Sequence, residues 1–392
     1  MNNNRSKMYW LIGNCVLLAI ILAGCSKSVG QTNNNSNTRY TWQEFSMGAD
    51  LSYVNIVEAS GAVYKENGKQ DDPYAILQRN GCNTVRVRLW HNPTWQNSLN
   101  GGLIFSNLAD ATRTIRRAKA AGMAVNLDLH YSDTWADPQH QEIPAAWRGL
   151  SLATMADSVY RYTSFVLNHL ASQGLTPEMI QVGNETNTGM LWPVGNTETA
   201  GWPAFATLLK AGIKAVRDFS ATSSIKPLII LHEAQLQTAE FWTRQLLAQG
   251  VTDFDILGLS HYFKWSTANS WSEVTRVLQT LRSISGKQVM IVETAFPFTN
   301  ENADRYNNIL WEASGSAVGY PFTPAGQRQY YTDLCRAVWQ AGGKGVMLWE
   351  PAWLTSRLND GWNVGSSWEN NALFNFQGEL HEGIRFATEA YK

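Results

Sequence analysis

Short apolar stretches alternate with longer amphipathic stretches along the chain from about residue 40 onward. Eight of the short stretches are rich in Val, Ile and Leu, a composition typical of strands that are covered on both faces. They occupy residues 45–50, 83–90, 124–130, 179–185, 227–233, 256–262, 288–293 and 345–350. The pattern therefore predicts eight buried strands.

The longer stretches show helical periodicity and carry signals for helix ends. Residues 107–122 combine Asn107 as N-cap, apolar side chains on one face and Gly122 as the stop. A second helix is predicted to begin at Ser151 and to end at Gly174, and a third ends at Gly286. Residues 355–383 lack this period, which predicts a long loop followed by a short closing helix.

Eight strand–helix units in a row predict a parallel sheet, and the chain length favours a closed (β/α)8 TIM barrel. The alternative is an open doubly wound sheet, but no Gly-rich phosphate-binding loop follows the first strand. We see no second domain within residues 40–392. Cys82 and Cys335, the two cysteines of this region, are expected to be buried thiols and not a disulfide.

Almost every predicted strand finishes on a polar or ionisable residue. Such groups cost free energy when they are buried without partners, so a purely structural barrel has no need of them. In a barrel of this kind the carboxyl ends of the strands carry the functional groups. The residues concerned are Asp50, Arg86, Arg88, Asp128, His130, Asn184, Glu185, His232, Glu233, His261, Tyr262, Glu293, Trp349 and Glu350.

Glu185 and Glu293 stand out because they end the fourth and seventh predicted strands. Two strands separate these two around the ring, so the carboxyl groups should face each other across the barrel mouth. Paired carboxylates of this kind cleave glycosidic bonds, one as an acid and the other as a nucleophile or base. Arg86 and Tyr262 are candidates to keep one of them ionised. Glu233 and Glu350 remain alternative members of the pair.

Composition and charge point the same way. The 17 Trp residues are far more than an average share, and aromatic rings pack well on the C–H faces of sugars. We expect about half of the loop tryptophans Trp95, Trp135, Trp147, Trp192, Trp265, Trp353 and Trp362 to line sugar subsites. A formal net charge of −1 argues against nucleic acid as a partner.

The N-terminus reads as a targeting signal. Arg5 and Lys7 precede an apolar run that is too short for an ordinary membrane span and ends in Leu-Ala-Gly-Cys at Cys25. This ending resembles the bacterial lipoprotein box, in which the cysteine is lipidated; the alternative is a plain signal peptide. We expect a signal peptide at residues 1–24, lipidation of Cys25 and a polar tether at residues 25–39. No Asp follows Cys25, which favours an outer-membrane or cell-surface location.

The strand ends lie within longer motifs that carry a family resemblance. "LDLHYSDTWADPQHQEIPAAW" and "QVGNETNTGMLWP" are the most specific, and "GADLSYV", "NTVRVRLWHNP", "GLSHY", "VETAFP", "LWEPAW" and "NNALFNF" accompany them. Together these stretches resemble glycoside hydrolase family 53, the endo-β-1,4-galactanases of clan A. The resemblance spans residues 48–376. His261 stands where the family often has an aromatic residue, which predicts a changed subsite.

The resemblance implies a role for each matching residue. Glu185 is expected to be the acid/base, Glu293 the nucleophile, and Asn184 the partner of the sugar 2-hydroxyl. Arg86 and Tyr262 should orient the nucleophile and keep it ionised. Trp349 should form the floor beneath the sugar, and the remaining substrate contacts would be Asp50, Asp128, His130 and Trp135.

The resemblance also implies a structural calcium site, because bacterial relatives carry an Asp/Asn-rich loop after the nucleophile. Asn302, Asp304 and Asn308 lie at ligand spacing, with Ser366 and Glu369 as further oxygen donors. Tyr306 stands where a His ligand is expected, and two carboxylates are few. A solvated loop is therefore the alternative.

The sequence thus predicts a lipid-anchored, monomeric endo-β-1,4-galactanase that retains anomeric configuration and needs no catalytic cofactor. Its substrate would be the galactan side chains of pectin. One alternative is another clan A β-glycanase such as a mannanase, xylanase or glucanase, because specificity lies in the loops. The other is a surface glycan-binding lipoprotein that lacks activity.

Overall fold

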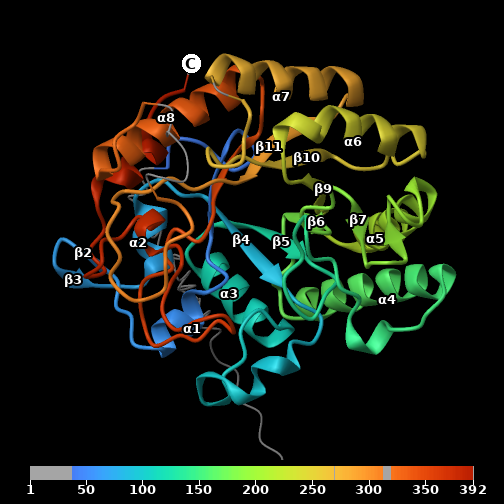
Figure 1. Cartoon of the computed structure of the whole chain (residues 1–392), viewed down its shortest axis with the longest axis horizontal. Coiled ribbons are helices and arrows are strands. Elements are labelled where there is room, and N and C mark those ends of the chain that lie inside the picture. Colours follow the sequence, from blue (N-terminus) through green and yellow to red (C-terminus); the bar gives the residue numbers. More distant parts are fainter. Residues whose placement is uncertain (1–37, 269, 312–318, 392) are drawn as a thin grey trace, which may run out of the picture. The chain divides into compact units, whose positions relative to one another are not determined.

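Eight parallel strands close into a barrel at the centre of the ribbon, and helices surround them (Figure 1). This computed structural model describes residues 38–268, 270–311 and 319–391. The expected signal peptide, Cys25 and nearly all of the expected tether lie outside the described residues. The strand order around the ring is β1, β4, β5, β6, β9, β10, β11 and β12. The (β/α)8 barrel predicted from the sequence is confirmed.

The barrel strands coincide with the eight predicted stretches. They are β1 (Ser46–Asp50), β4 (Thr84–Leu89), β5 (Ala124–Leu129), β6 (Met179–Val182), β9 (Leu228–Glu233), β10 (Ile256–Ser260), β11 (Gln288–Glu293) and β12 (Gly345–Leu348). The fourth predicted strand is shorter than expected. It ends before Gly183, whose φ of 84° turns the chain out of the sheet, so Glu185 lies in the following loop.

Helices follow the barrel strands in sequence. The α-helices are α1 (Val54–Ala59), α2 (Pro73–Arg79), α3 (Leu108–Ala120), α4 (Leu152–Ala171), α5 (Trp202–Thr222), α6 (Leu236–Ala248), α7 (Trp271–Ser285) and α8 (Pro324–Gln340). Short 3-10 helices are η1 (Thr94–Ser98), η2 (Asn100–Gly102), η3 (Ala145–Trp147), η5 (Glu369–Asn371) and η6 (Glu382–Thr388). Two small hairpins, β2 (Lys65–Glu66) with β3 (Lys69–Gln70) and β7 (Gly189–Met190) with β8 (Gly195–Asn196), lie in the loops.

The predicted helix ends are confirmed by their capping contacts. The side chain of Asn107 accepts a hydrogen bond from the backbone N–H of Asp110, and that of Ser151 accepts one from Thr154. Gly286 closes α7 in the left-handed conformation at a φ of 69°. After β12 the chain runs through a long loop to η5 and η6, as its irregular pattern predicts.

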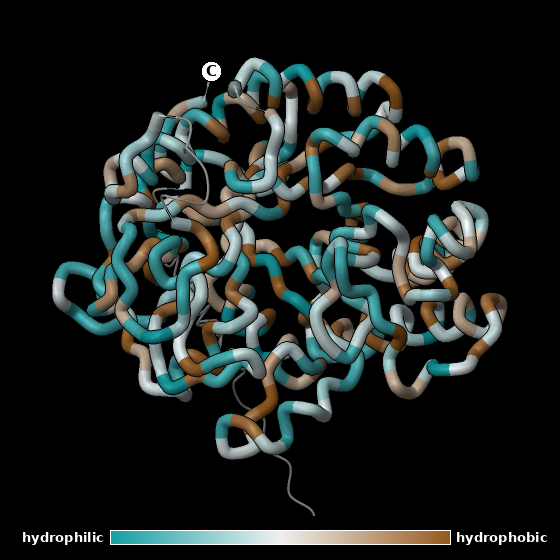
Figure 2. Tube along the Cα trace, in the orientation of Figure 1, coloured by the Kyte–Doolittle hydropathy of each residue, from teal (hydrophilic) through white to brown (hydrophobic). Residues whose placement is uncertain are grey.

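Two layers of apolar side chains hold the barrel together. The larger fills the space between the strands and the helices, whose traces alternate between hydrophilic and hydrophobic residues (Figure 2). The smaller fills the barrel interior on the side away from the carboxyl ends of the strands. It consists of Met179, Ile230, Ile256, Met290, Val292 and Met347. Above this second layer the inward-facing side chains are polar, among them Arg86, Gln181 and His232. The apolar plug supports a polar layer at the carboxyl ends of the strands.

Cys82 and Cys335 are separate buried thiols, as predicted. Within the described ranges, no helix combines the length and apolar character needed to cross a bilayer.

Candidate active site

A pocket of about 740 Å³ opens at the carboxyl ends of the barrel strands. Loops that follow six of the strands contribute to its wall, and much of that wall is aromatic. Its tryptophans are Trp135, Trp265, Trp349, Trp353, Trp362 and Trp368. Four of the seven predicted loop tryptophans thus line the pocket, while Trp95, Trp147 and Trp192 do not. Trp368 was not predicted, because it lies in the long irregular segment after β12.

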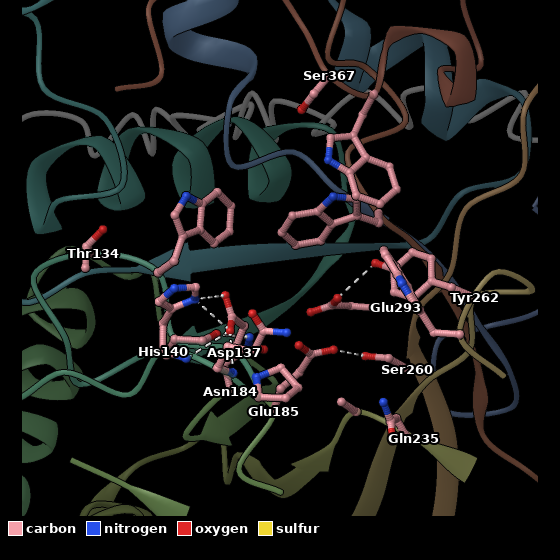
Figure 3. Close-up of a pocket in the computed structure, with 18 of the residues that line it drawn as sticks. Thr134, Asp137, His140, Asn184, Glu185, Gln235, Ser260, Tyr262, Glu293 and Ser367 are labelled. Carbon is pink, nitrogen blue, oxygen red and sulfur yellow. Dashed lines mark hydrogen bonds and ion pairs between the residues drawn. The ribbon is translucent and has the colours of Figure 1, made fainter. Parts of the chain in front are cut away.

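Glu293, the last residue of β11, points into this pocket between a cation and a phenol. The Tyr262 hydroxyl donates to Glu293 Oε2 at 2.9 Å (Figure 3). Arg86 Nη2 forms an ion pair with Glu293 Oε1 at 2.8 Å. Burial raises the pKa of Glu293 to about 7, although the Arg86 charge opposes that rise. Both partners predicted for this carboxyl group are in contact with it.

Glu185 lies opposite, three residues beyond the end of β6. Its φ of 45° falls in the left-handed region that non-glycine residues rarely adopt. Ser260, the last residue of β10, donates from its hydroxyl to Glu185 Oε1 at 2.6 Å (Figure 3). Burial and the nearby charge of Glu293 raise the pKa of Glu185 well above its ordinary value.

The two carboxyl groups form a close pair. Oxygen atoms of Glu185 and Glu293 and a ring nitrogen of His232 lie within 4.8 Å of one another. Arg86 stands beside Glu293, so Glu293 loses its proton before Glu185 does. The pair therefore has a state with one carboxylic acid and one carboxylate, which is what acid-assisted nucleophilic attack requires.

Arg86 organises the layer beneath Glu293. It is fully buried, and its guanidinium meets Asp50 at 2.9 Å, Asp128 at 2.8 Å and the Asn184 side-chain oxygen at 2.7 Å. His130 Nε2 lies 3.0 Å from Asp128, while His130 Nδ1 accepts from the Trp90 indole and the Ala136 backbone N–H. The Arg86 guanidinium thus forms ion pairs with three carboxylates, those of Asp50, Asp128 and Glu293. These residues come from the ends of several strands.

The structure places three of the expected substrate contacts below the pocket wall. Asp50, Asp128 and His130 were expected to contact substrate, but they do not line the pocket and are at most 2% exposed. Arg86 contacts Asp50 and Asp128, and His130 contacts Asp128. Asp128 Oδ1 is buried without a hydrogen-bond partner among the described residues. These three residues lie one layer below Glu293 and contact it through Arg86.

Asn184, Trp135, Trp349 and Tyr262 line the pocket, where substrate contacts were expected. Trp135 and Trp349 pack with ring centroids 5.7 Å apart, at an angle of 53°. The Arg88 guanidinium lies 4.2 Å from the Trp135 ring centroid and 5.6 Å from that of Trp349. This buried cation fixes two of the aromatic walls.

Several polar residues of the site were not assigned a role from the sequence. Ser260 and His232 contact Glu185 directly, and Gln181 contacts Asn184 at 3.1 Å. The sequence did carry a signal for Gln181, because it is a polar residue inside an otherwise apolar strand. His261, expected to alter a subsite, points away from the pocket and packs edge-on against Trp271 at 5.9 Å. Because successive side chains of a strand point to opposite faces, its neighbours Ser260 and Tyr262 line the pocket instead.

The five candidate calcium ligands gather from the loop after β11 and the loop after β12. Asp304 Oδ2 accepts from the Ser366 backbone N–H at 2.9 Å, and the Asn308 amide donates to the Asn302 side-chain oxygen. Asn308 Oδ1 and Glu369 Oε2 are buried without a hydrogen-bond partner among the described residues. Burial raises the pKa of Glu369 to about 7. Both unpartnered atoms are hard oxygen donors of the kind that calcium binds.

A (β/α)8 barrel with two paired glutamates in an aromatic pocket at its carboxyl end is the arrangement of a barrel glycoside hydrolase. Sequence comparison agrees, because the model of glycosyl hydrolase family 53 matches residues 46–387. An arabinogalactan endo-beta-1,4-galactanase of Cellvibrio japonicus is 41% identical over 360 residues, 91% of either chain. The chain belongs to glycosyl hydrolase family 53.

Two solved structures support the assignment. The family 53 catalytic domain of Ignisphaera aggregans matches with a TM-score of 0.81 and 31% identity, over 91% of this chain and 99% of that one. A fungal beta-1,4-galactanase matches with a TM-score of 0.73 and 33% identity, over 88% of this chain and 98% of that one.

Proposed function

We propose that this protein is an endo-β-1,4-galactanase that hydrolyses arabinogalactan of the pectic type with retention of configuration. The short separation of Glu185 and Glu293 carries the proposal. Their oxygen atoms lie within 4.8 Å, close to the carboxyl spacing of about 5–5.5 Å for retaining glycosidases and well below about 6.5–9.5 Å for inverting ones. The relatives named above act on the same linkage.

In the first step Glu293 attacks the anomeric carbon while Glu185 gives its proton to the leaving glycosidic oxygen. The bond between sugar and leaving chain breaks, and an ester between the sugar and Glu293 forms. Arg86 and Tyr262 hold Glu293 ionised and aimed before the attack.

In the second step Glu185, now ionised, takes a proton from water as that water attacks the anomeric carbon. The ester breaks, Glu293 leaves as a carboxylate, and Glu185 regains its proton. Two inversions at one carbon give net retention.

The walls of the pocket position the sugar. The Asn184 amide donates one hydrogen to the Ala136 carbonyl at 2.7 Å, and we assign its second hydrogen to the sugar 2-hydroxyl. Trp349, only 7% exposed and wedged beside Trp135, supplies the apolar floor under the same sugar. No chemistry of a cofactor enters this scheme.

Purified protein should release short galacto-oligosaccharides with newly formed β-anomeric ends from linear β-1,4-galactan, seen by NMR early in the reaction. Predominantly α-anomeric product would contradict retention. Cleavage of mannan, xylan or glucan in preference to galactan would favour another clan A β-glycanase. Binding of galactan with no new reducing ends would instead favour a glycan-binding surface protein.

We further propose a structural calcium ion bound by Asn302, Asp304, Asn308, Ser366 and Glu369. Its charge would satisfy the unpartnered oxygens of Asn308 and Glu369. Removing the ion with a chelator should lower the melting temperature by a few degrees, because loss of about 1 kcal/mol costs roughly 2–4 °C in a domain of about 150–250 residues and less in a larger one. Glu369→Gln should show a lower melting temperature that the chelator no longer changes. If elemental analysis finds no calcium in the purified protein, and the chelator leaves its melting curve unchanged, the ion is ruled out.

We also propose that Cys25 is lipidated and anchors a monomeric enzyme to the outside of the bacterial cell, in the outer membrane. The signal-like run before Cys25 and the polar residues after it support this arrangement. Cells fed radiolabelled palmitate should label the protein, and Cys25→Ala should abolish the label while Cys15→Ala leaves it intact. Labelling that survives in Cys25→Ala would contradict the anchor. Protease added to whole cells should then degrade the anchored enzyme.

A further inference from the structure

Glu185 alternates between acid and base in the proposed cycle, so its proton must sit on a defined oxygen each time. The Ser260 hydroxyl lies 2.6 Å from Glu185 Oε1, and the His232 Nε2 atom lies 3.0 Å from the Ser260 oxygen. A β-bulge between Leu259 and Ser260 brings Ser260 opposite Glu293 in the sheet register. Glu185, Ser260 and His232 thus form a hydrogen-bonded chain across β10 and β9.

The direction of this chain follows from the surroundings of His232 Nδ1. The Gln181 amide nitrogen and the Glu185 backbone N–H approach Nδ1 at 2.9 and 3.3 Å, and both are donors. The Asn184 oxygen is also 2.9 Å away, but it already accepts from Arg86 and from Gln181. A hydrogen on Nδ1 would therefore meet two donors and an occupied acceptor.

Every one of these groups is satisfied when Nδ1 accepts and the ring hydrogen sits on Nε2. His232 is fully buried, and burial lowers its pKa well below the ordinary value, so the ring stays neutral with one hydrogen. His232 Nε2–H then donates to the Ser260 oxygen. Ser260 has its own hydrogen left to donate, and Glu185 Oε1 receives it.

We propose that Ser260 and His232 are positioning residues that make Glu185 Oε1 a permanent acceptor, so that the transferable proton always resides on Glu185 Oε2. This inference rests on the proposed function of Glu185 as the acid/base. The chain leaves only one oxygen free to give the proton to the glycosidic oxygen and to take one from water. It also stabilises the carboxylate that forms after the first step.

The charged groups facing Glu185 come from several elements. Glu293 on β11 and Asp137 in the loop after β5 raise the Glu185 pKa, whereas Arg86 on β4 and the Ser260 hydrogen bond lower it. Glu185 must be protonated for the first step, so activity is lost as pH rises through its pKa. Deleting the Ser260 hydroxyl removes a stabiliser of the carboxylate and should move that alkaline limit upward.

The first test compares Ser260→Ala with wild type by ¹³C NMR of glutamate carboxyl carbons, with Glu185→Gln to assign the signal. Loss of one hydrogen bond to a charged group should raise the apparent pKa of Glu185 by about one to two units. The alkaline limb of the rate–pH profile should shift by the same amount. Ser220→Ala is the matched control, because Ser220 is a buried serine that bonds only within α5. An unchanged Glu185 pKa in Ser260→Ala would overturn the proposal.

The second test reads the His232 tautomer directly from ¹⁵N-histidine NMR, with His232→Gln to assign the ring. We expect a neutral ring protonated at Nε2 throughout the pH range of activity. A hydrogen on Nδ1, or a ring that becomes charged in that range, would overturn the proposal. Neither NMR test uses substrate. A failure of the proposed function would appear as wild-type protein that leaves galactan intact, whereas a failure of this inference would leave galactan cleavage normal.

Discussion

Glu293→Ala should lower kcat on β-1,4-galactan by at least about four orders of magnitude, because the nucleophile itself is removed. Folding should survive the change. Arg86 keeps Asp50 and Asp128 as partners, so no buried charge is left alone. The measurement is release of reducing ends together with a thermal melting curve. The melting temperature should stay within a few degrees of wild type.

Azide gives this variant a chemical signature. The small anion fits the space left by the missing carboxylate and attacks once from that side, so an activated β-galactoside should give the α-galactosyl azide. Glu233→Gln is the matched control, since Glu233 also ends a strand and is buried. Its oxygens accept from the Asn187 amide, the Thr238 hydroxyl and the Gln235 backbone N–H, so a melting curve of this variant is recorded beside its activity. Inactivity of Glu233→Gln together with an active Glu293→Ala would shift the nucleophile to Glu233.

Glu185→Ala should lose activity according to the leaving group of the substrate. On galactan, whose leaving oxygen needs a proton, we expect a loss of about 10²–10⁴-fold, the usual contribution of a general acid. An aryl β-galactoside with an acidic phenol needs no such help, so its first step should stay nearly as fast as in wild type. The sugar ester on Glu293 would then accumulate, visible as a burst of phenol and as added mass on the protein.

Azide again separates the two glutamates. In Glu185→Ala it attacks the accumulated ester without needing a base, so turnover should rise and the product should be the β-galactosyl azide. A second inversion after the first explains this retained configuration. If galactan and the activated substrate lost activity equally, and azide changed neither rate, Glu185 would not be the acid/base.

The sequence was sufficient for the barrel and for the proximity of Glu185 and Glu293, because both follow from the strand pattern. Alternating apolar stretches locate the strands, and in a parallel barrel every strand end reaches the same rim. Glu185 and Glu293 could therefore be paired although 108 positions separate them in the numbering (293 − 185). The contacts of Arg86 and Tyr262 with Glu293 follow from the same geometry.

Depth within the barrel was harder to predict. A residue near a strand end is either on the pocket wall or one layer below it, and a shift of one or two positions decides which. Asp50, Asp128 and His130 lie in the lower layer for this reason. The β-bulge that re-aims Ser260 leaves no mark in the hydrophobic pattern. Trp368 and Asp360 reach the wall from a segment without periodicity, so only the folded chain shows their place.

The left-handed backbone of Glu185 has a consequence for how such a chain changes over generations. At a φ of 45° a side chain is tolerated at a cost of about 1–2 kcal/mol that glycine does not bear. Selection for hydrolysis therefore keeps a glutamate at position 185 that selection for folding stability alone would replace. A duplicate copy that is no longer selected for hydrolysis should therefore gain stability from Gly or Asn at position 185.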